Sequence, residues 1–246
     1  MKIAILSDIH ANREAFEAVL ADCAARGAGR FIVLGDIVGY GPDPAWCVEK
    51  TVALAEAGAT VIRGNHDQAI NDPSPSMNSD AKAAIDWTTG VLSPAQKAFL
   101  AALPLSSAEE DRLCLHSEAS APSRFHYVRN AEGAARHFAH CEQRLSFCGH
   151  LHRPALYASG PGGKVTSFTP SRATPVPLLA QRRWLAVIGS VGQPRDGDPA
   201  AGYAILDTGT GELSFLKVPY DIETTAAKIR AAGLPDSLAD RLFKGV

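Results

Sequence analysis

Residues 3–10 read IAILSDIH, a run of four apolar residues that leads through Ser7 into Asp8 and His10. Four later stretches follow the same design: FIVLGD at 31–36, TVIRGNH at 60–66, RLCLHS at 112–117 and LSFCGHLH at 145–152. Short apolar runs bounded by glycine or a polar residue are typical of strands buried on both faces, as in parallel sheets. The sequence therefore predicts a buried sheet whose strands end in polar residues.

Ligands of open α/β sheets collect just beyond the carboxyl ends of the strands, where these polar residues lie. Residues two apart in extended backbone project to the same side, so each of the pairs 8/10 and 150/152 can face one ion. Carboxylate, amide and imidazole groups suit divalent transition metals, and the set is large enough for two ions. We expect eight residues on one rim: Asp8, His10, Asp36, Asn65, His66, His116, His150 and His152.

Predicted helices separate the first three strands. Asn12 can cap one helix, and Pro44 can begin a second that runs toward Glu56. This βαβαβ alternation predicts parallel pairing with right-handed crossovers. From about residue 155 onward strands dominate and Gly/Pro turns separate them, which predicts a second sheet packed on the first.

Two further segments stand outside this alternation. Residues 68–112 hold a loop and two helical stretches between two ligand-bearing segments, so we expect this insertion to cap the site and select the substrate. A helix over 222–231 is expected to precede a short polar tail. The length of 246 residues is compatible with one domain over 1–246.

Composition narrows the classes of partner. The 24 basic and 26 acidic residues give a net charge of −2, so no whole-molecule field attracts nucleic acid or an anionic membrane. Five cysteines without CxxC pairs predict reduced thiols in a cytoplasmic protein. Met1 leads directly into the first strand, so we expect no signal peptide. No apolar run reaches the roughly 18 to 20 residues of a spanning helix.

The five motifs together resemble the calcineurin-like metallophosphoesterase family, and its small bacterial phosphodiesterase-like branch in overall appearance. The family pattern runs D-x-H, G-D, G-N-H-D/E, a lone H, and G-H-x-H. It is matched here, in order, by residues 8–10, 35–36, 64–67, 116 and 149–152. The resemblance implies an α/β (α+β) fold, a four-layer αββα sandwich of two mixed β-sheets flanked by helices.

The resemblance also implies a dinuclear centre. Asp8, His10 and His152 would hold one divalent ion, and Asn65, His116 and His150 the other, with Asp36 bridging. The ligand types leave manganese, iron, zinc and nickel open. A bridging hydroxide would attack phosphorus in line, and His66 would protonate the departing oxygen, with Asp67 as a candidate to orient its imidazole.

Other residues are candidates for substrate contact. The segment IGSVGQPRDGDP at 188–199 resembles a Gly-Ser segment near the site in this branch, and Ser190, Gly192 and Arg195 are expected to contact phosphate oxygens. An ordinary turn with a solvent-facing arginine is the alternative. His126 follows the lone histidine and is expected to reach the substrate. His137 and His140 are expected to be solvated on a helix.

Two departures from the family pattern bear on specificity. Ser117 stands where many members have glycine after the lone histidine. The loop GDIVGYG at 35–41 lacks the arginine that protein serine/threonine phosphatases place after a comparable segment, which argues against a phosphoprotein substrate.

We therefore expect a metal-dependent hydrolase of phosphoric esters that acts on a small phosphorylated substrate, with diesters favoured over monoesters. A nucleotide pyrophosphatase or dinucleotide hydrolase is an alternative that uses the same core. A non-catalytic scaffold is the other alternative, although such proteins tend to have lost a ligand or the catalytic histidine, and all are present here.

Overall fold

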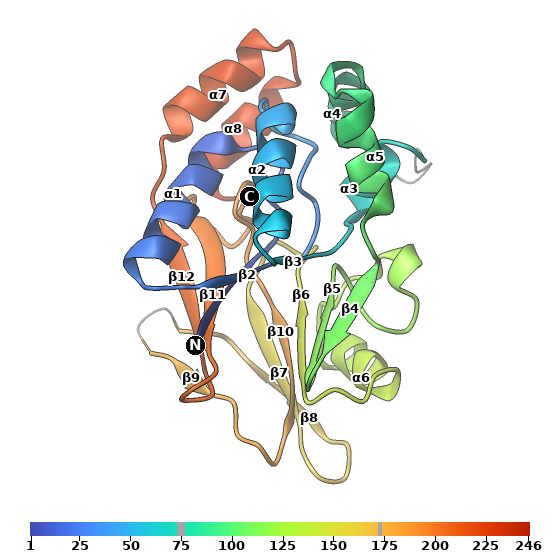
Figure 1. The fold of residues 1–246 in the computed structure, drawn as a ribbon, viewed down its shortest axis with the longest axis vertical. Coiled ribbons are helices and arrows are strands. Elements are labelled where there is room, and N and C mark those ends of the chain that lie inside the picture. The colour runs from blue at the N-terminus through green and yellow to red at the C-terminus, as the bar shows by residue number, and fades with distance from the viewer. Residues whose placement is uncertain (73–76, 172–173) are drawn as a thin grey trace.

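The computed structural model describes residues 1–72, 77–171 and 174–246, whose strands form two six-stranded sheets (Figure 1). In spatial order the first sheet contains β3 (Thr60–Val61), β2 (Arg30–Val33), β1 (Lys2–Leu6), β11 (Ala201–Asp207), β12 (Glu212–Val218) and β9 (Val176–Pro177). The second contains β4 (Ser106–Glu109), β5 (Arg112–Leu115), β6 (Leu145–Cys148), β10 (Arg183–Val187), β7 (Ala155–Ser159) and β8 (Val165–Phe168). Both are mixed, since each contains parallel and antiparallel pairs.

Strand β1 is buried on both faces, as its apolar run predicts. Ile3 and Ile5 belong to the core between the two sheets, together with Phe147 of the second sheet. Leu6 belongs to the core on the opposite face, where it joins Phe16 of a covering helix. Because successive residues of a strand point to opposite faces, a continuous apolar run is what a central strand of a layered sandwich needs.

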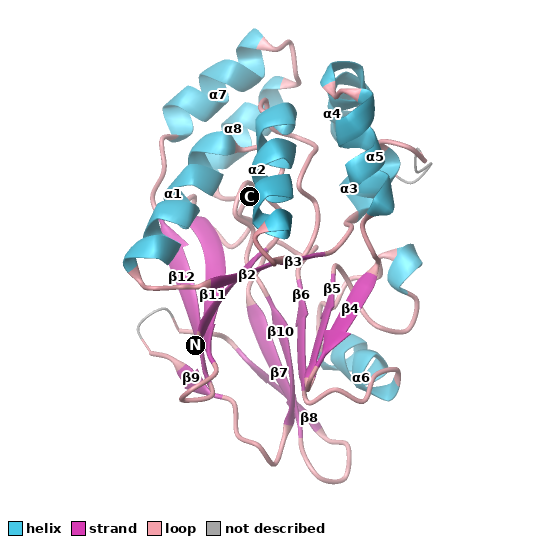
Figure 2. Cartoon of the chain, in the orientation of Figure 1, coloured by secondary structure: helices cyan, strands magenta, loops and turns pink. Residues whose placement is uncertain are grey.

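Helices cover the outer faces of both sheets (Figure 2). On the first sheet lie α1 (Arg13–Ala25) and α2 (Pro44–Glu56), with α7 (Ile222–Ala231) packed on α1 and on α8 (Asp236–Lys244). Asn12 caps α1 as predicted, since its Oδ1 accepts from the Ala15 N–H at 3.1 Å. Helix α6 (Ala131–Ala139) packs on the second sheet through Ala134 and Phe138. The order helix, sheet, sheet, helix confirms the predicted αββα sandwich.

The assignment of strands to the two sheets differs from the prediction. Strands β5 and β6, expected beside the first three, belong to the second sheet, whereas β11 and β12 extend the first sheet beyond β1. Apolar runs of similar character fill both sheets, so the sequence pattern does not identify strand partners. The carboxyl ends of β2 and β5 still meet, because Nδ1 of His116 donates to the Leu34 carbonyl at 2.7 Å.

Residues 68–112 contain the two predicted helices, α4 (Ser79–Val91) and α5 (Pro94–Ala102), and the edge strand β4. Strand β4 was not predicted because its residues are polar or small and three of the four are exposed. Ala81 and Ala84 of α4 share one apolar cluster with Tyr40 and with Leu238 of α8. The insertion and the carboxyl-terminal helices are therefore packed together through this cluster.

Helix α8 occupies the stretch expected to be a short polar tail, so that prediction is wrong. Its buried residues are Leu238, Ala239 and Leu242, which form one narrow apolar stripe in an otherwise charged segment. Because most residues of this segment are polar, the stripe was not recognised from the sequence. None of the described helices is long and apolar enough to cross a membrane.

Candidate metal centre and substrate pocket

Most of the candidate ligands lie in turns with left-handed backbone. The φ angles are 55° at Asp8, 49° at His10, 52° at Asp36, 66° at His150 and 59° at His152. Non-glycine residues rarely adopt this region, and such strain concentrates at functional sites. The pairs 8/10 and 150/152 thus converge through tight turns, and not through the extended backbone that we expected.

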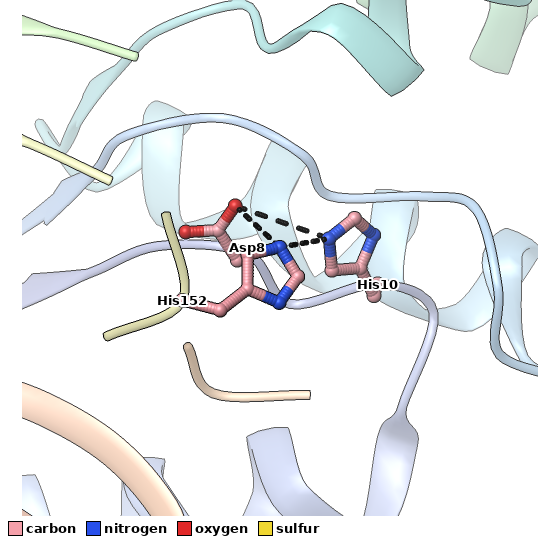
Figure 3. A group of neighbouring side chains, drawn as sticks. All are labelled: Asp8, His10 and His152. Atoms are coloured by element: carbon pink, nitrogen blue, oxygen red, sulfur yellow. Dashed lines mark hydrogen bonds and ion pairs between the residues drawn. The ribbon is translucent and has the colours of Figure 1, made fainter. Parts of the chain in front are cut away.

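The first group of side chains is Asp8, His10 and His152, which come from the loops after β1 and β6 (Figure 3). The Nε2 atoms of His10 and His152 are 3.1 Å apart. Oδ1 of Asp8 lies 3.3 Å from Nε2 of His152 and 3.9 Å from Nε2 of His10. All three side chains are buried, so one ion could be enclosed by three ligands.

The second group is Asp36, His116 and His150. Nε2 of His116 lies 3.2 Å from Nδ1 of His150 and 3.1 Å from Oδ1 of Asn65, which adds an amide oxygen to this group. Oδ2 of Asp36 lies 3.4 Å from Nε2 of His116 and 3.6 Å from Nε2 of His10. Asp36 therefore lies between the two groups, within reach of both.

Backbone carbonyls fix the tautomers of three of these histidines. Nδ1 of His10 lies 3.1 Å from the Val38 oxygen, and Nδ1 of His152 lies 2.6 Å from the Gln193 oxygen. His116 has the same arrangement with Leu34. A carbonyl only accepts, so each Nδ1 carries a proton, and Nε2 is the atom that faces the cluster and is available to a metal.

This donor set fits divalent transition metals. Lone pairs on His10 and His152 that face each other at 3.1 Å repel unless a cation or a proton lies between them. Oδ1 of Asp8 is buried and has no hydrogen-bond partner within the described part of the chain. Imidazole nitrogen with carboxylate oxygen is a ligand combination used by zinc, iron, nickel and manganese.

The two central carboxylates favour the ionised form. Burial alone would raise the pKa of Asp8, but His152 holds it below its ordinary value. Burial would also raise the pKa of Asp36, but His116, His66 and His10 together hold it below its ordinary value. Both groups can therefore act as anionic ligands at neutral pH.

His66 lies beside the cluster, on the short helix α3 (Asn65–Ala69). Its ring is 4.8 Å from that of His10 and 4.5 Å from that of Tyr40, between centroids. Burial lowers the pKa of His66 to about 4. Nδ1 is buried against the backbone, because a Cβ on Gly39 would lie 2.4 Å from it, and it has no hydrogen-bond partner among the described residues.

Asp67, the candidate to orient His66, bonds to the backbone instead. Its carboxylate accepts from the backbone N–H groups of Gly64 at 2.9 Å, Ile37 at 2.9 Å and Val38 at 3.2 Å. It therefore holds the loop that carries Asp36. Burial, together with the charge of Asp36, raises the pKa of Asp67 to about 7.

A cavity of about 690 Å³ opens over the two groups. Arg195 lines it, and Oε1 of Gln193 holds this guanidinium by accepting from Nη2 at 2.7 Å. The exposed His126 also lines it, on the side of the segment that follows His116. Other lining residues are Asp36, Tyr40, Asn65, His66, Gln68, Asp72, Met77, Asn78, Ala81, Ser123, Arg124, Phe125, Tyr127, His150 and His152.

Ser190 is placed differently from the expectation that it contacts the substrate. Its side chain is fully buried, and Oγ donates to the Asp8 carbonyl at 2.8 Å while it accepts from the Gln193 N–H at 2.8 Å. Gly192 supports the same loop by close backbone approach, since a Cβ there would lie 1.8 Å from the Ile9 carbonyl oxygen. Both residues brace the turn that carries Asp8.

His137 is another correction, because it is fully buried and not solvated. Its Nδ1 accepts from the Ala119 N–H at 3.2 Å. His137 shares the buried side of α6 with Ala134 and Phe138, which pack on the second sheet. His140 is exposed, as expected.

Sequence reasoning missed three aromatic residues around the site. Tyr40 packs on His10 and His66, Phe125 lies 5.8 Å from His116, and Tyr127 stacks on His150 at 4.0 Å, all between ring centroids. The one available signal was their place in the ligand-bearing segments, since each follows a motif residue by 4 to 11 positions.

Comparison with known proteins identifies the family. The domain model of the calcineurin-like phosphoesterase superfamily matches residues 1–211. The chain belongs to this superfamily. The resemblance inferred from the five motifs is thereby confirmed, and the buried cluster of candidate ligands agrees with a metal-dependent phosphoesterase.

Relatives cover nearly the whole of this phosphoesterase. A metallophosphoesterase from Sphaerobacter thermophilus has 38% identity and a TM-score of 0.89, over 100% of this chain and 99% of that one. A hypothetical protein from Pyrococcus horikoshii OT3 has the same fold at 20% identity and a TM-score of 0.80, over 100% and 98% of the two chains. An uncharacterized protein of Methanocaldococcus jannaschii is 33% identical over 99% of this chain and 98% of its own length.

Proposed function

We propose that this phosphoesterase hydrolyses small phosphoric diesters with two divalent metal ions. Asp8, His10 and His152 would hold one ion, and Asn65, His116 and His150 the other, with Asp36 as the bridge. The observation that carries this proposal is the position of Asp36. One of its carboxylate oxygens lies within 3.6 Å of an imidazole nitrogen from each group.

When bound, two such ions supply charge stabilisation and a water of lowered pKa. The chain's own residues would do the rest. Arg195 presents several N–H donors at the cavity and would hold the non-bridging phosphate oxygens. Because Nδ1 of His66 is sealed against Gly39, Nε2 is the atom through which His66 would pass a proton to the departing oxygen.

The shape and charge of the cavity favour a diester. A diester has two organic groups and one negative charge, and the lining of the cavity extends from the proposed ligands to Met77 and Ala81 of the insertion. Its volume of about 690 Å³ lies in the range of sites for complete small molecules. Arg195 and Arg124 are its cationic side chains besides histidine, and Asp72 offsets part of their charge.

The insertion at 68–112 contributes to this part of the site. Met77, Asn78 and Ala81 line the cavity, at and just before the beginning of α4. We propose that this segment caps the substrate and selects its organic groups. The segment from Ser123 to Tyr127 also lines the cavity.

The test is hydrolysis of bis(p-nitrophenyl) phosphate and p-nitrophenyl phosphate by protein loaded with Mn²⁺, together with metal analysis of protein purified without chelator. We expect about two metal equivalents per chain and a higher kcat/KM for the diester. A higher kcat/KM for the monoester would overturn the substrate class. Stoichiometric metal without turnover of either compound would favour a scaffold.

A further inference from the structure

His150 is held differently from the other three histidines of the cluster. The atom that faces His116 is Nδ1, at 3.2 Å from Nε2 of His116. For His10, His116 and His152 a backbone carbonyl fixes the ring. Within residues 1–72, 77–171 and 174–246, no such carbonyl accepts from the ring of His150.

A tyrosine covers the ring of His150 instead. Tyr127 lies parallel to it, with the planes 10° apart and the centroids 4.0 Å apart. The guanidinium of Arg129 lies over the Tyr127 ring, 4.4 Å from its centroid. Because His150 already occupies one face of the tyrosine ring, Arg129 covers the other. The three side chains form a layered stack that we call the 129/127/150 stack.

The stack restricts the rotation of the imidazole. A turn of the His150 ring about its Cβ–Cγ bond would drive ring atoms into the tyrosine at this separation. The backbone that delivers Tyr127 is itself constrained. It follows a 3-10 helix (Pro122–Arg124) and Phe125, which has a left-handed φ of 51°. This segment begins after His116, at Ser117, where the chain departs from the family pattern.

We propose that Tyr127 is a positioning residue that fixes the imidazole of His150 for metal binding. This inference rests on the proposed function, because it assigns Tyr127 to the second of the two metal sites. The phenol ring holds the imidazole of His150 in place by stacking on it, and the hydroxyl group is not required for this. Since both faces of the ring are covered, Tyr127 cannot also serve as a stacking surface for a substrate.

The test is titration of the metal-free full chain with Mn²⁺ alone, with the affinity of each site followed by electron paramagnetic resonance. We expect Tyr127→Leu to weaken one of two sites by about tenfold, in the range known for residues that support metal ligands, and to leave the other unchanged. Tyr127→Phe is the matched control and should bind both ions as the wild type does. Unchanged affinity in Tyr127→Leu, or equal weakening in Tyr127→Phe, would overturn the inference.

Tyr127 is only half-buried, so its replacement should leave the fold intact, which circular dichroism checks. If Tyr127→Leu fails to fold, Tyr127→Met provides the second test, because it keeps an apolar side chain and removes the ring that stacks on His150. Weaker binding at one of the two sites supports the inference, and unchanged binding at both contradicts it. A wild-type chain that binds fewer than two Mn²⁺ would instead contradict the proposed function, whatever the variants do.

Discussion

Asn65 and Asp36 differ in how many ions each would contact. Asn65 approaches only the second group, through Oδ1 at 3.1 Å from Nε2 of His116, whereas Asp36 lies between both groups. We expect Asn65→Ala to lower the affinity of one metal site by roughly 10- to 100-fold. Asp36→Asn should weaken both. Metal analysis after dialysis measures this, and equal loss of both ions from Asn65→Ala would contradict the allotment.

His66 allows a second test with single residues. His66→Gln should retain metal, because every proposed ligand remains, but should lose turnover by roughly 10²- to 10⁴-fold for esters with poor leaving groups. The loss should be smallest for p-nitrophenyl esters, whose leaving group needs no proton. A rate loss that is the same for methyl and p-nitrophenyl diesters would remove the proposed role of His66.

Single residues also show where sequence reasoning reached its limit. Asp8, His116 and the other candidate ligands could be named because donor chemistry and order along the chain are visible in the sequence. The contacts of Ser190 and Tyr127 could not, since a buried serine that serves a backbone carbonyl and one that contacts phosphate have the same local pattern. Which group a side chain faces depends on loops distant in sequence.

Among the elements, the loops that follow β1 and β6 approach each other closely at Gly149. A Cβ there would lie 1.8 Å from Oγ of Ser7 and 2.6 Å from Oδ2 of Asp8. We expect Gly149→Ala to reduce the free energy of unfolding by about 1 to 3 kcal/mol and to weaken metal binding. Gly160→Ala is the control, because a Cβ at Gly160 meets nothing within 4 Å. Chemical denaturation with and without Mn²⁺ compares them, and equal stability of the two variants would contradict the expectation.

Helix α6 gives a prediction about pH. Burial lowers the pKa of His137 from 6.5 to about 4 in the folded protein, so the unfolded chain takes up the proton first as the pH falls. Above pH 6.5 this residue has no effect on stability. Between pH 6.5 and 4 it should lower the free energy of unfolding by up to roughly 3 kcal/mol.

Replacement of His137 isolates this effect from that of the carboxylates. His137→Gln should flatten the dependence of stability on pH between 6.5 and 4, as measured by urea unfolding. His140→Gln, on the exposed side of the same helix, should leave the wild-type profile unchanged. Parallel profiles for the wild type and His137→Gln would show that His137 does not titrate in this way.

At the scale of the whole molecule, the layers were predictable but the membership of each sheet was not. Apolar runs such as 3–6 and 145–148 reveal buried strands, and the alternation with amphipathic helices reveals the layers. The pairing of Ala4 with Ile205 joins strands about 200 residues apart. The apolar sequences of these two strands resemble those of the other buried strands, so they do not indicate which strands pair. Helix α8 was missed for a related reason, since its apolar stripe is buried only by packing in one cluster with Tyr40 and α4, which are distant in sequence.

Both sheets contribute proposed ligands, so bound metal should hold the two sheets together. Asp8 and Asp36 follow strands of the first sheet, whereas His116 and His150 follow strands of the second. Ligand at 100 times its Kd stabilises a folded state by about 2.7 kcal/mol, which for a chain of this size raises Tm by roughly 5 to 10 °C. We expect Mn²⁺ to give this increase over chelated protein in calorimetry, and Asp36→Asn to abolish most of it. Mg²⁺, which prefers oxygen ligands, should stabilise the chain less than Mn²⁺ does. An equal shift in Asp36→Asn would mean that the stabilising ions bind elsewhere.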